Sequence, residues 1–229
     1  MEAIVLAGGF GTRLAQVVKD VPKPMAPVAG KPFLQYVADD LIEQGMDRLI
    51  FAVCYKKECI MDFFDGNYRG AEVAYSVEEE PLLTGGAIRK ALSQCREDRA
   101  FVINGDTFFG VDLKAMRAFS LRAGKEVVIA VREMRNFSRY GTVSVNAQME
   151  VTAFHEKRQC QRGYINGGIY DLRRGVLETY PEAFSMEELC FPALLQAREL
   201  STFVSEGMFI DIGIPEDYER AQALFGSGT

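Results

Sequence analysis

The chain has 229 residues, of which 48% are hydrophobic and 25% are charged, and its formal net charge is −6. These values are typical of one soluble domain with a sizeable core. The sequence has no Lys/Arg-rich run and no apolar run near the ~18 residues of a membrane span, so we expect no nucleic-acid partner and no membrane partner.

The cysteines and the N-terminus favour a cytoplasmic protein. The five cysteines include no Cys-x-x-Cys pair, and their odd number favours reduced thiols. The first residues run directly into a glycine-rich segment and lack the basic and long apolar regions of a signal peptide. The single histidine, His155, argues against a histidine-based triad and against a metal site with several histidines.

Strands and helices alternate through the first half of the chain. Residues 3–7 are a continuous apolar run, which is typical of a strand covered on both faces of a parallel sheet. Apolar residues then recur at helical spacing between Pro32, in a first turn, and Gly45, a stop signal. The predicted elements are strands at 3–7, 49–54, 71–77, 100–104 and 126–132, and helices at 32–44, 84–95 and 113–123.

The second half is richer in strands. Predicted strands cover 141–146, 151–156, 164–170 and 202–211, and a last predicted helix covers 215–225. The whole pattern predicts an α/β fold with a doubly wound, mostly parallel, Rossmann-like sheet flanked by helices. Ligands of such sheets bind beyond the carboxyl ends of the strands, where the glycine-rich segment and Asp106 fall.

The glycine-rich segment is the first candidate for phosphate binding. It directly follows the first predicted strand and has the sequence Gly8-Gly9-Phe10-Gly11-Thr12-Arg13-Leu14. Glycines let the backbone approach a phosphate closely, and Thr12 and Arg13 add a hydroxyl and a guanidinium group. The spacing differs from the Rossmann fingerprint, because Leu14 takes the third glycine position, and from the P-loop. A plain turn from strand to helix is the alternative.

A second candidate is the segment Pro22-Lys23-Pro24. The prolines stiffen the backbone on both sides of Lys23 and disfavour helix there. A lysine held in this way is suited to act as a fixed point charge on a phosphate. Taken alone, the segment is more often a surface loop.

Together these two segments resemble the signature of the sugar-phosphate nucleotidyltransferase family, Gly-Gly-x-Gly-Thr-Arg-Leu followed by Pro-Lys-Pro. Further matches follow in order, between Met1 and about Ala221. They are the segments 79–87, 104–107, 139–141, 154–157, 166–170 and 211–215. The sequence departs from the family pattern at Leu83, where glycine is more usual, and at Ile214, where threonine is commoner.

The resemblance implies a set of site residues. Arg13, Lys23 and Lys157 would be the catalytic cations, and Asp106 and Asp211 would bind Mg²⁺. The nucleotide would contact Leu6, Ala7, Gly8, Gly9, Gly11, Thr12, Arg13, Lys23, Thr84, Gly85, Gly86 and Asp106. The sugar phosphate would contact Tyr140, Gly141, Glu156, Lys157, Asn166 and Gly167. Within one domain, residues 1–125 would mainly bind the nucleotide, and residues 126–229 the sugar phosphate and the metal.

A narrower resemblance points to one substrate pair. Segments 24–27, 104–109, 139–141 and 211–218 are similar to D-glycero-D-manno-heptose 1-phosphate guanylyltransferases, which make GDP-heptose for bacterial surface polysaccharides. This implies a cytoplasmic, Mg²⁺-dependent enzyme that transfers a nucleotidyl group from GTP to the heptose 1-phosphate and releases pyrophosphate. Relatives that use mannose 1-phosphate share most of these motifs, so the sequence leaves the identity of the base and of the sugar open. It also leaves the oligomeric state open, and a homo-oligomer is possible.

Simpler interpretations exist for the single residues. Asp106 and Asp211 would then be solvated strand-end carboxylates, and Glu156 and Lys157 a surface pair. Two other classes of function are a non-catalytic regulatory subunit that binds a nucleotide sugar and a dinucleotide-dependent oxidoreductase. Retention of the catalytic cations and aspartates disfavours the first, and the glycine spacing disfavours the second.

Overall fold

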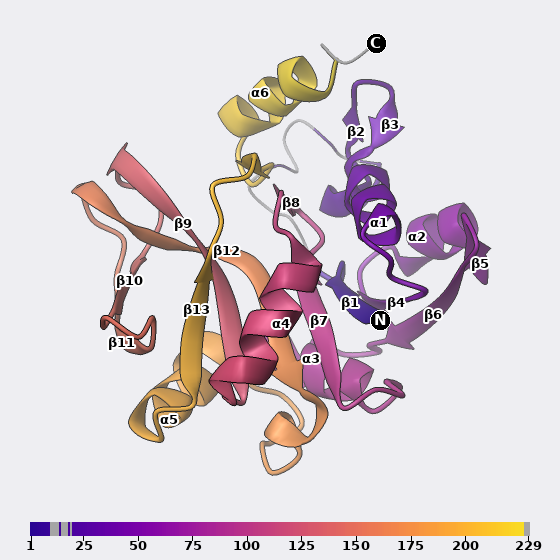
Figure 1. Cartoon of the computed structure of the whole chain (residues 1–229). Coiled ribbons are helices and arrows are strands. Elements are labelled where there is room, and N and C mark those ends of the chain that lie inside the picture. Colours follow the sequence, from indigo (N-terminus) through magenta and orange to yellow (C-terminus); the bar gives the residue numbers. More distant parts are fainter. Residues whose placement is uncertain (10–13, 15–17, 19, 227–229) are drawn as a thin grey trace.

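A computed structural model provides the structure of the chain, and the described residues are 1–9, 14, 18 and 20–226 (Figure 1). The predicted site residues Gly11, Thr12 and Arg13 therefore lie outside the described residues.

One mixed sheet forms the centre of the molecule and contains ten strands within the described residues. Its main path runs β11-β10-β12-β7-β1-β4-β6-β5, and β9 pairs with both β12 and β13. Strands β7, β1, β4 and β6 are parallel, whereas β12 is antiparallel to β7 and β9. The strands are β1 (Glu2–Leu6), β4 (Arg48–Val53), β5 (Asn67–Tyr68), β6 (Ala71–Val77), β7 (Arg99–Asn104), β9 (Val127–Phe137), β10 (Thr142–Val145), β11 (Val151–His155), β12 (Cys160–Arg173) and β13 (Leu200–Val204).

Helices cover both faces of this sheet (Figure 1). The helices are α1 (Phe33–Glu43), α2 (Lys57–Phe64), α3 (Leu83–Leu92), α4 (Leu113–Ala123), α5 (Phe191–Gln196) and α6 (Pro215–Gly226). Alternate residues of β1 enter two separate cores: Val5 packs with residues of α1, α2 and α4, and Ile4 packs with residues of α3 and α5. This two-sided burial explains the continuous apolar run, and the predicted fold class is confirmed.

Short elements complete the fold near the carboxyl ends of the parallel strands. The hairpin β2 (Pro27–Val28) and β3 (Lys31–Pro32) follows the short helix η1 (Lys23–Met25). The two-stranded ribbon β8 (Thr107–Phe109) and β14 (Phe209–Asp211) joins distant parts of the chain. The remaining turns are η2 (Arg174–Leu177) and η3 (Met186–Cys190). Among the described residues, no helix is both long and apolar enough to cross a membrane.

The predicted strand 202–211 is wrong, because the chain there forms two strands of different sheets. Strand β13 ends at Val204 and β14 begins at Phe209. Between them, Gly207 passes so close to the carbonyl of Gly110 that a side chain would not fit. Helix α2 and the helical residues 186–196 were not predicted, because both are short and their apolar spacing is weak.

Candidate active site

A cavity of about 490 Å³ lies at the carboxyl ends of β1, β4, β6 and β7. This is the position expected for the ligand of a doubly wound sheet. The lining residues are Leu6, Gly8, Gly9, Lys23, Pro24, Ala52, Cys54, Glu78, Pro81, Leu83, Thr84, Ala87, Asn104, Asp106 and Gly213.

Lys23 lies between the two aspartates predicted to bind metal. Its Nζ donates to Asp106 Oδ2 at 2.5 Å and lies 3.6 Å from Asp211 Oδ1. The Lys23 side chain is only 10% exposed, so little water screens these charges. The structure therefore brings together three of the predicted residues, and the ammonium group balances the repulsion between the two carboxylates.

The β8–β14 ribbon brings the two aspartates together. Asp211 is the register partner of Thr107, which directly follows Asp106. The backbone N–H of Gly213 fixes Asp211 by donating to its Oδ1 at 2.7 Å. The Thr107 hydroxyl donates to Asp106 Oδ1 at 3.2 Å. Two carboxylates that lie 105 positions apart in the sequence are thus brought together beside Lys23, where Asp106 lines the cavity.

Helix α6 holds the segment that carries Lys23. The Tyr218 hydroxyl and the Gln222 amide both donate to the carbonyl of Pro27, at 2.5 and 2.7 Å. The N–H of Ala29 donates to Gln222 Oε1 at 2.8 Å. Because the hairpin directly follows η1, these bonds from the C-terminal helix restrict the movement of Lys23.

Tyr140, predicted to contact the sugar phosphate, lies close enough to Asp211 to feel its charge. Its ring packs edge-on against Phe209, with ring centroids 5.8 Å apart. Burial, followed by the charge of Asp211, raises the pKa of Tyr140. A Cβ atom at position 141 would lie only 2.5 Å from the carbonyl oxygen of His155. Gly141 is therefore also required by the packing of the backbone.

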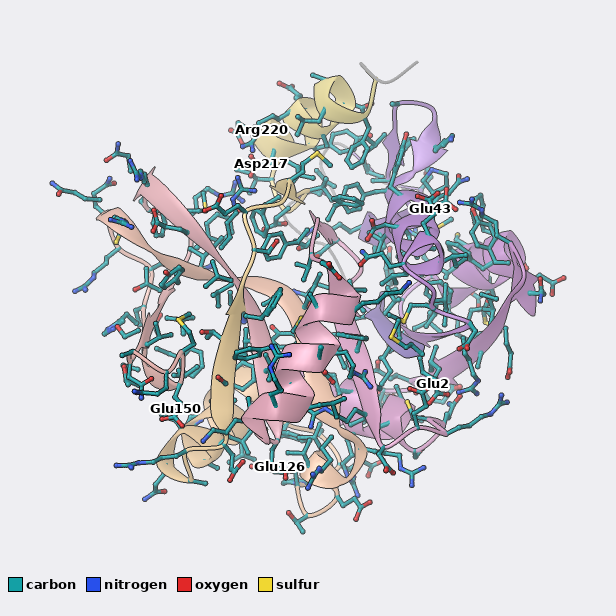
Figure 2. All side chains as sticks on the ribbon, in the orientation of Figure 1. Glu2, Glu43, Glu126, Glu150, Asp217 and Arg220 are labelled. Atoms are coloured by element: carbon teal, nitrogen blue, oxygen red, sulfur yellow. The ribbon has the colours of Figure 1, made fainter. Side chains whose placement is uncertain are left out.

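Arg139 is a site residue to which the sequence assigned no role. Its guanidinium lies 5.3 Å from the Tyr140 ring centroid and 3.9 Å from Asp211 Oδ2. It also pairs with Asp217 of α6, which in turn contacts Arg220 at 3.4 Å (Figure 2). Arg139 therefore links the last helix to the aspartate cluster.

Glu156 and Lys157 are exposed and follow directly after β11. Within the part of the chain that the structure describes, neither side chain has a hydrogen-bond or ion-pair partner. The structure thus places them at the surface, and their predicted contact with the sugar phosphate stays a prediction.

Asn166 and Gly167 shape an irregularity in β12. The Asn166 amide donates to the Tyr170 hydroxyl and accepts from the N–H of Gly168, both at 2.9 Å. The register with β9 shifts between Asn166 and Tyr170. A side chain at Gly167 would overlap Phe109. Both residues therefore have a structural role, and their contact with a sugar stays a prediction.

The backbone expected to meet the nucleobase is already engaged. The N–H groups of Gly85 and Gly86 donate to the carbonyl of Phe184 at 2.8 and 3.2 Å. Neither glycine lines the 490 Å³ cavity, whereas Thr84 does. These donors serve the docking of α3, and the predicted contact of both glycines with the nucleotide stays a prediction.

Leu83, a departure from the family pattern, adopts the conformation that glycine favours. Its φ is +60°, in the left-handed region, and its side chain is 57% exposed beside the cavity. This explains why glycine is the more usual residue at this position.

Cys54 and Glu78 are polar lining residues that fall outside every motif matched in the sequence. Both directly follow strands of the parallel sheet, β4 and β6, and this position at the carboxyl end was the signal that could have identified them. Gly8 packs against both, because a side chain there would meet Cys54 Cβ at 3.2 Å and Glu78 Oε1 at 3.3 Å.

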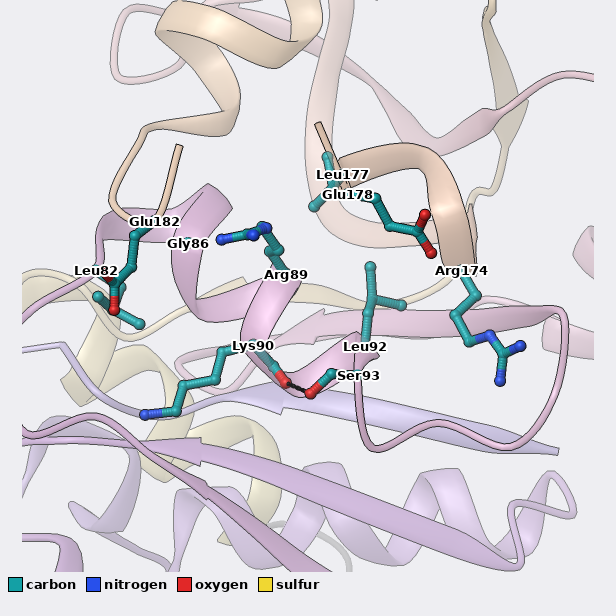
Figure 3. Close-up of a pocket in the computed structure, with 10 residues that line it drawn as sticks. All are labelled: Leu82, Gly86, Arg89, Lys90, Leu92, Ser93, Arg174, Leu177, Glu178 and Glu182. Carbon is teal, nitrogen blue, oxygen red and sulfur yellow. Dashed lines mark hydrogen bonds between the residues drawn. The ribbon is translucent and has the colours of Figure 1, made fainter. Parts of the chain in front are cut away.

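A second cavity, of about 770 Å³, lies on the other side of α3 (Figure 3). Arg89 and Lys90 of α3 line it together with Arg174 and Glu178. Gly86 is the one predicted site residue among its described lining residues. The charged cluster of Lys23, Asp106 and Asp211 is absent from that lining, so the smaller cavity is the candidate active site.

Comparison with protein families identifies the architecture. The family model described as nucleotidyl transferase matches residues 2–227. The chain belongs to the nucleotidyl transferase family. The fold is thus that of a nucleotidyltransferase.

Several relatives match this chain over nearly its whole length. A D-glycero-α-D-manno-heptose 1-phosphate guanylyltransferase from Aneurinibacillus thermoaerophilus is 43% identical over 97% of both chains. One from Campylobacter jejuni is also 43% identical, over 95% of this chain and 97% of that one. A mannose-1-phosphate guanylyltransferase from Mycobacterium tuberculosis is 34% identical, and the match covers 64% of its length.

A solved structure has the same fold. HddC from Yersinia pseudotuberculosis, in complex with GMP-PN, is 37% identical, with a TM-score of 0.87 over 98% of this chain and 99% of that chain. The match extends through both halves of the sheet, so the arrangement of β7, β8 and β14 around the cavity belongs to a shared fold.

Proposed function

We propose that this chain transfers a guanylyl group from GTP to D-glycero-D-manno-heptose 1-phosphate, giving GDP-heptose and pyrophosphate. The observation that carries this proposal is the Lys23–Asp106–Asp211 cluster at the cavity, two members of which line it, in a chain 43% identical to two heptose 1-phosphate guanylyltransferases over nearly its whole length. We further propose that the reaction takes place in the cytoplasm and that the product feeds a surface polysaccharide.

The reaction requires positioning and charge balance more than proton transfer. An oxygen of the sugar phosphate attacks the α-phosphorus of GTP, and the bond from that phosphorus to the bridging oxygen of pyrophosphate breaks. The nucleophile is already ionised, so the protein need not supply a general base. Since both reactants are anionic, catalysis rests on holding them in line and on compensating their charge.

The chain's cations have separate tasks in this scheme. Lys23 lies at the cavity end that holds Asp106 and would compensate charge at the α-phosphate. Arg13, which lies outside the described residues, would hold the departing pyrophosphate, and Lys157 would hold the incoming sugar phosphate. Glu156, Asn166 and Tyr140 would contact the sugar hydroxyls.

Asp106 and Asp211 fit a divalent cation. A cationic group, the Lys23 ammonium, already lies within 3.6 Å of both carboxylates, and two carboxylates with substrate phosphates are a usual ligand set for Mg²⁺. Bound there, Mg²⁺ would supply positive charge for the triphosphate. When it binds, Lys23 would be free to leave the aspartates and contact phosphate.

The experiment that tests this function is product identification. Purified protein is incubated with GTP, heptose 1-phosphate and Mg²⁺, and the products are separated and identified by mass spectrometry. We expect GDP-heptose and pyrophosphate in equal amounts. Binding of the nucleotide sugar without any turnover would instead support the regulatory subunit.

A second sugar deserves the same test, because mannose-1-phosphate guanylyltransferases are also similar to this chain. Heptose differs from mannose by one carbon and one hydroxyl at the far end of the sugar. If kcat/KM with GTP is higher for mannose 1-phosphate, the chain acts as a mannose guanylyltransferase and the heptose assignment is wrong.

A further inference from the structure

Arg139 is a cation beside the aspartate cluster to which the mechanism above gives no task. It lies in the connection between β9 and β10, and its side chain is partly buried. The two terminal nitrogens of its guanidinium face different carboxylates. Nη1 pairs with Oδ2 of Asp217 in α6, and Nη2 lies 3.9 Å from Oδ2 of Asp211. A planar guanidinium can bridge two carboxylates in this way, whereas an ammonium group is a single point charge.

Arg139 and Lys23 face different oxygens of Asp211. Oδ1 of Asp211 accepts from the N–H of Gly213 at 2.7 Å and lies 3.6 Å from Lys23 Nζ, whereas Oδ2 faces Arg139. The Asp211 side chain is only 23% exposed, so water screens these charges incompletely. Each oxygen of this carboxylate therefore has a cation of its own.

The charges that these ion pairs connect cancel one another. Among the described residues, the connected carboxylates are Asp106, Asp211 and Asp217, and the connected cations are Lys23, Arg139 and Arg220. A free divalent cation would enter a place without net negative charge and would lie close to positive groups that repel it. A triphosphate that carries the same cation is net negative, so the lysine and the arginines attract it.

The position of Arg139 is fixed from outside the aspartate pair. Its partner Asp217 lies in the first turn of α6, is buried, and contacts Arg220 at 3.4 Å. The same helix is bonded to the carbonyl of Pro27 through Tyr218. The guanidinium is therefore anchored to α6 and does not depend on Lys23 to stay beside the aspartates.

We propose that Arg139 is a positioning residue that balances the charge of Asp211, so that the aspartate pair takes up a divalent cation together with the triphosphate and binds the free cation poorly. This inference rests on the proposed function, in which Asp106 and Asp211 hold Mg²⁺. Without Arg139, the charge of Asp211 would be compensated only by Lys23, which Asp106 shares. The two carboxylates would then bind a divalent cation without nucleotide.

The test measures how tightly the free protein binds Mn²⁺, a substitute for Mg²⁺ that is detected by EPR. Neither nucleotide nor sugar phosphate is present. We expect Arg139→Gln to bind Mn²⁺ about threefold or more tightly than the wild-type protein, because it lacks a positive charge 3.9 Å from a ligand oxygen. Arg139→Lys keeps the charge and should restore weak binding.

The matched control is Arg220→Gln, which removes the same charge from the other side of Asp217. Arg220 is 61% exposed and contacts Asp217 at 3.4 Å, and it makes no ion pair with Asp211 within the described part of the chain. This variant should stay within about twofold of the wild-type affinity for Mn²⁺, because water screens an exposed charge. If Arg139 were purely structural, its loss would loosen Asp211 and weaken Mn²⁺ binding. Unchanged or weaker binding by a folded Arg139→Gln protein would therefore overturn the proposal.

The wild-type protein alone provides a check that needs no folded variant. In an equimolar mixture at micromolar concentrations, it should leave most of the EPR signal of free Mn²⁺ unchanged. Uptake of most of the Mn²⁺ would show the inference to be wrong, even where GDP-heptose is formed. Absence of GDP-heptose from a reaction with GTP and heptose 1-phosphate would instead refute the proposed function. The two failures are distinguishable, because the Mn²⁺ measurement contains neither substrate.

Discussion

At the scale of single residues, the site is dominated by charges that compensate one another. Lys23 lies within 3.6 Å of both Asp106 and Asp211, and Arg139 lies 3.9 Å from Asp211. Removing one member leaves the others with uncompensated charge at a partly buried position. Activity should therefore respond sharply to single substitutions here.

Asp106→Asn and Asp211→Asn should each reduce turnover by about 10²-fold or more while leaving the fold intact, since each removes a charge that binds Mg²⁺ and balances Lys23. Turnover is measured across a Mg²⁺ titration, with circular dichroism as the check on folding. Near-normal activity of either variant at low Mg²⁺ would mean that the metal binds elsewhere.

Lys23→Ala and Lys157→Ala should differ in the kinetic constant that they change. Lys23 acts where charge changes during the reaction, so its loss should lower kcat by about 10²–10³-fold. Lys157 should contribute uniform binding, so its loss should raise KM for the sugar phosphate. Steady-state kinetics with each substrate varied in turn separate the two effects. A raised KM for GTP alone in Lys157→Ala would contradict the assignment.

Glu78→Gln should stabilise the protein at neutral pH. The raised pKa of Glu78 means that folding favours the protonated form, so the ionised carboxylate lowers stability above that pKa. As the pH falls from above the raised pKa to the ordinary pKa of a glutamate, Glu78 becomes protonated and no longer lowers the stability of the wild-type protein. Thermal unfolding should show a higher Tm for Glu78→Gln at pH 8 and a smaller difference at acidic pH. A lower Tm at pH 8 would show that the charge of Glu78 stabilises the fold.

At the scale of elements, most strands and helices of the parallel half were predictable, α2 and β5 excepted, and their long-range contacts were not. Continuous apolar runs located β1, β4 and β7, because both faces of these strands are buried. The docking of α3 on Phe184, about 100 residues along the chain, leaves no local sequence signal. For the same reason the engaged N–H groups of Gly85 and Gly86 could not be foreseen.

Gly85→Ala tests this docking contact. A methyl group at Gly85 would overlap the Phe184 ring, so we expect a loss of about 1–3 kcal/mol in the free energy of unfolding. Gly66→Ala is the matched control, because a side chain at Gly66 meets no atom within 4 Å. Both are measured by denaturant unfolding. Equal stability of the two variants would show that Phe184 moves aside freely.

At the scale of the whole molecule, one sheet carries charged groups from both ends of the chain into a single cavity. The resemblance to a known family allowed Lys23, Asp106 and Asp211 to be predicted as members of one site. Asp106 follows β7 and Asp211 ends β14 of the ribbon beside it. Glu78 was not predicted because it lies one residue before the matched segment 79–87. Its burial depends on Gly8 and Leu82, which only the folded chain brings to it.

The most direct test of the central claim is a matrix of the four nucleoside triphosphates against several sugar 1-phosphates, scored by the initial rate of pyrophosphate release with Mg²⁺. The chain is proposed to be a guanylyltransferase for a heptose 1-phosphate. The account therefore predicts the highest kcat/KM for GTP with D-glycero-D-manno-heptose 1-phosphate and no pyrophosphate release without a sugar phosphate. A higher kcat/KM for UTP, CTP or ATP, or no sugar-dependent release with any pair, would contradict it.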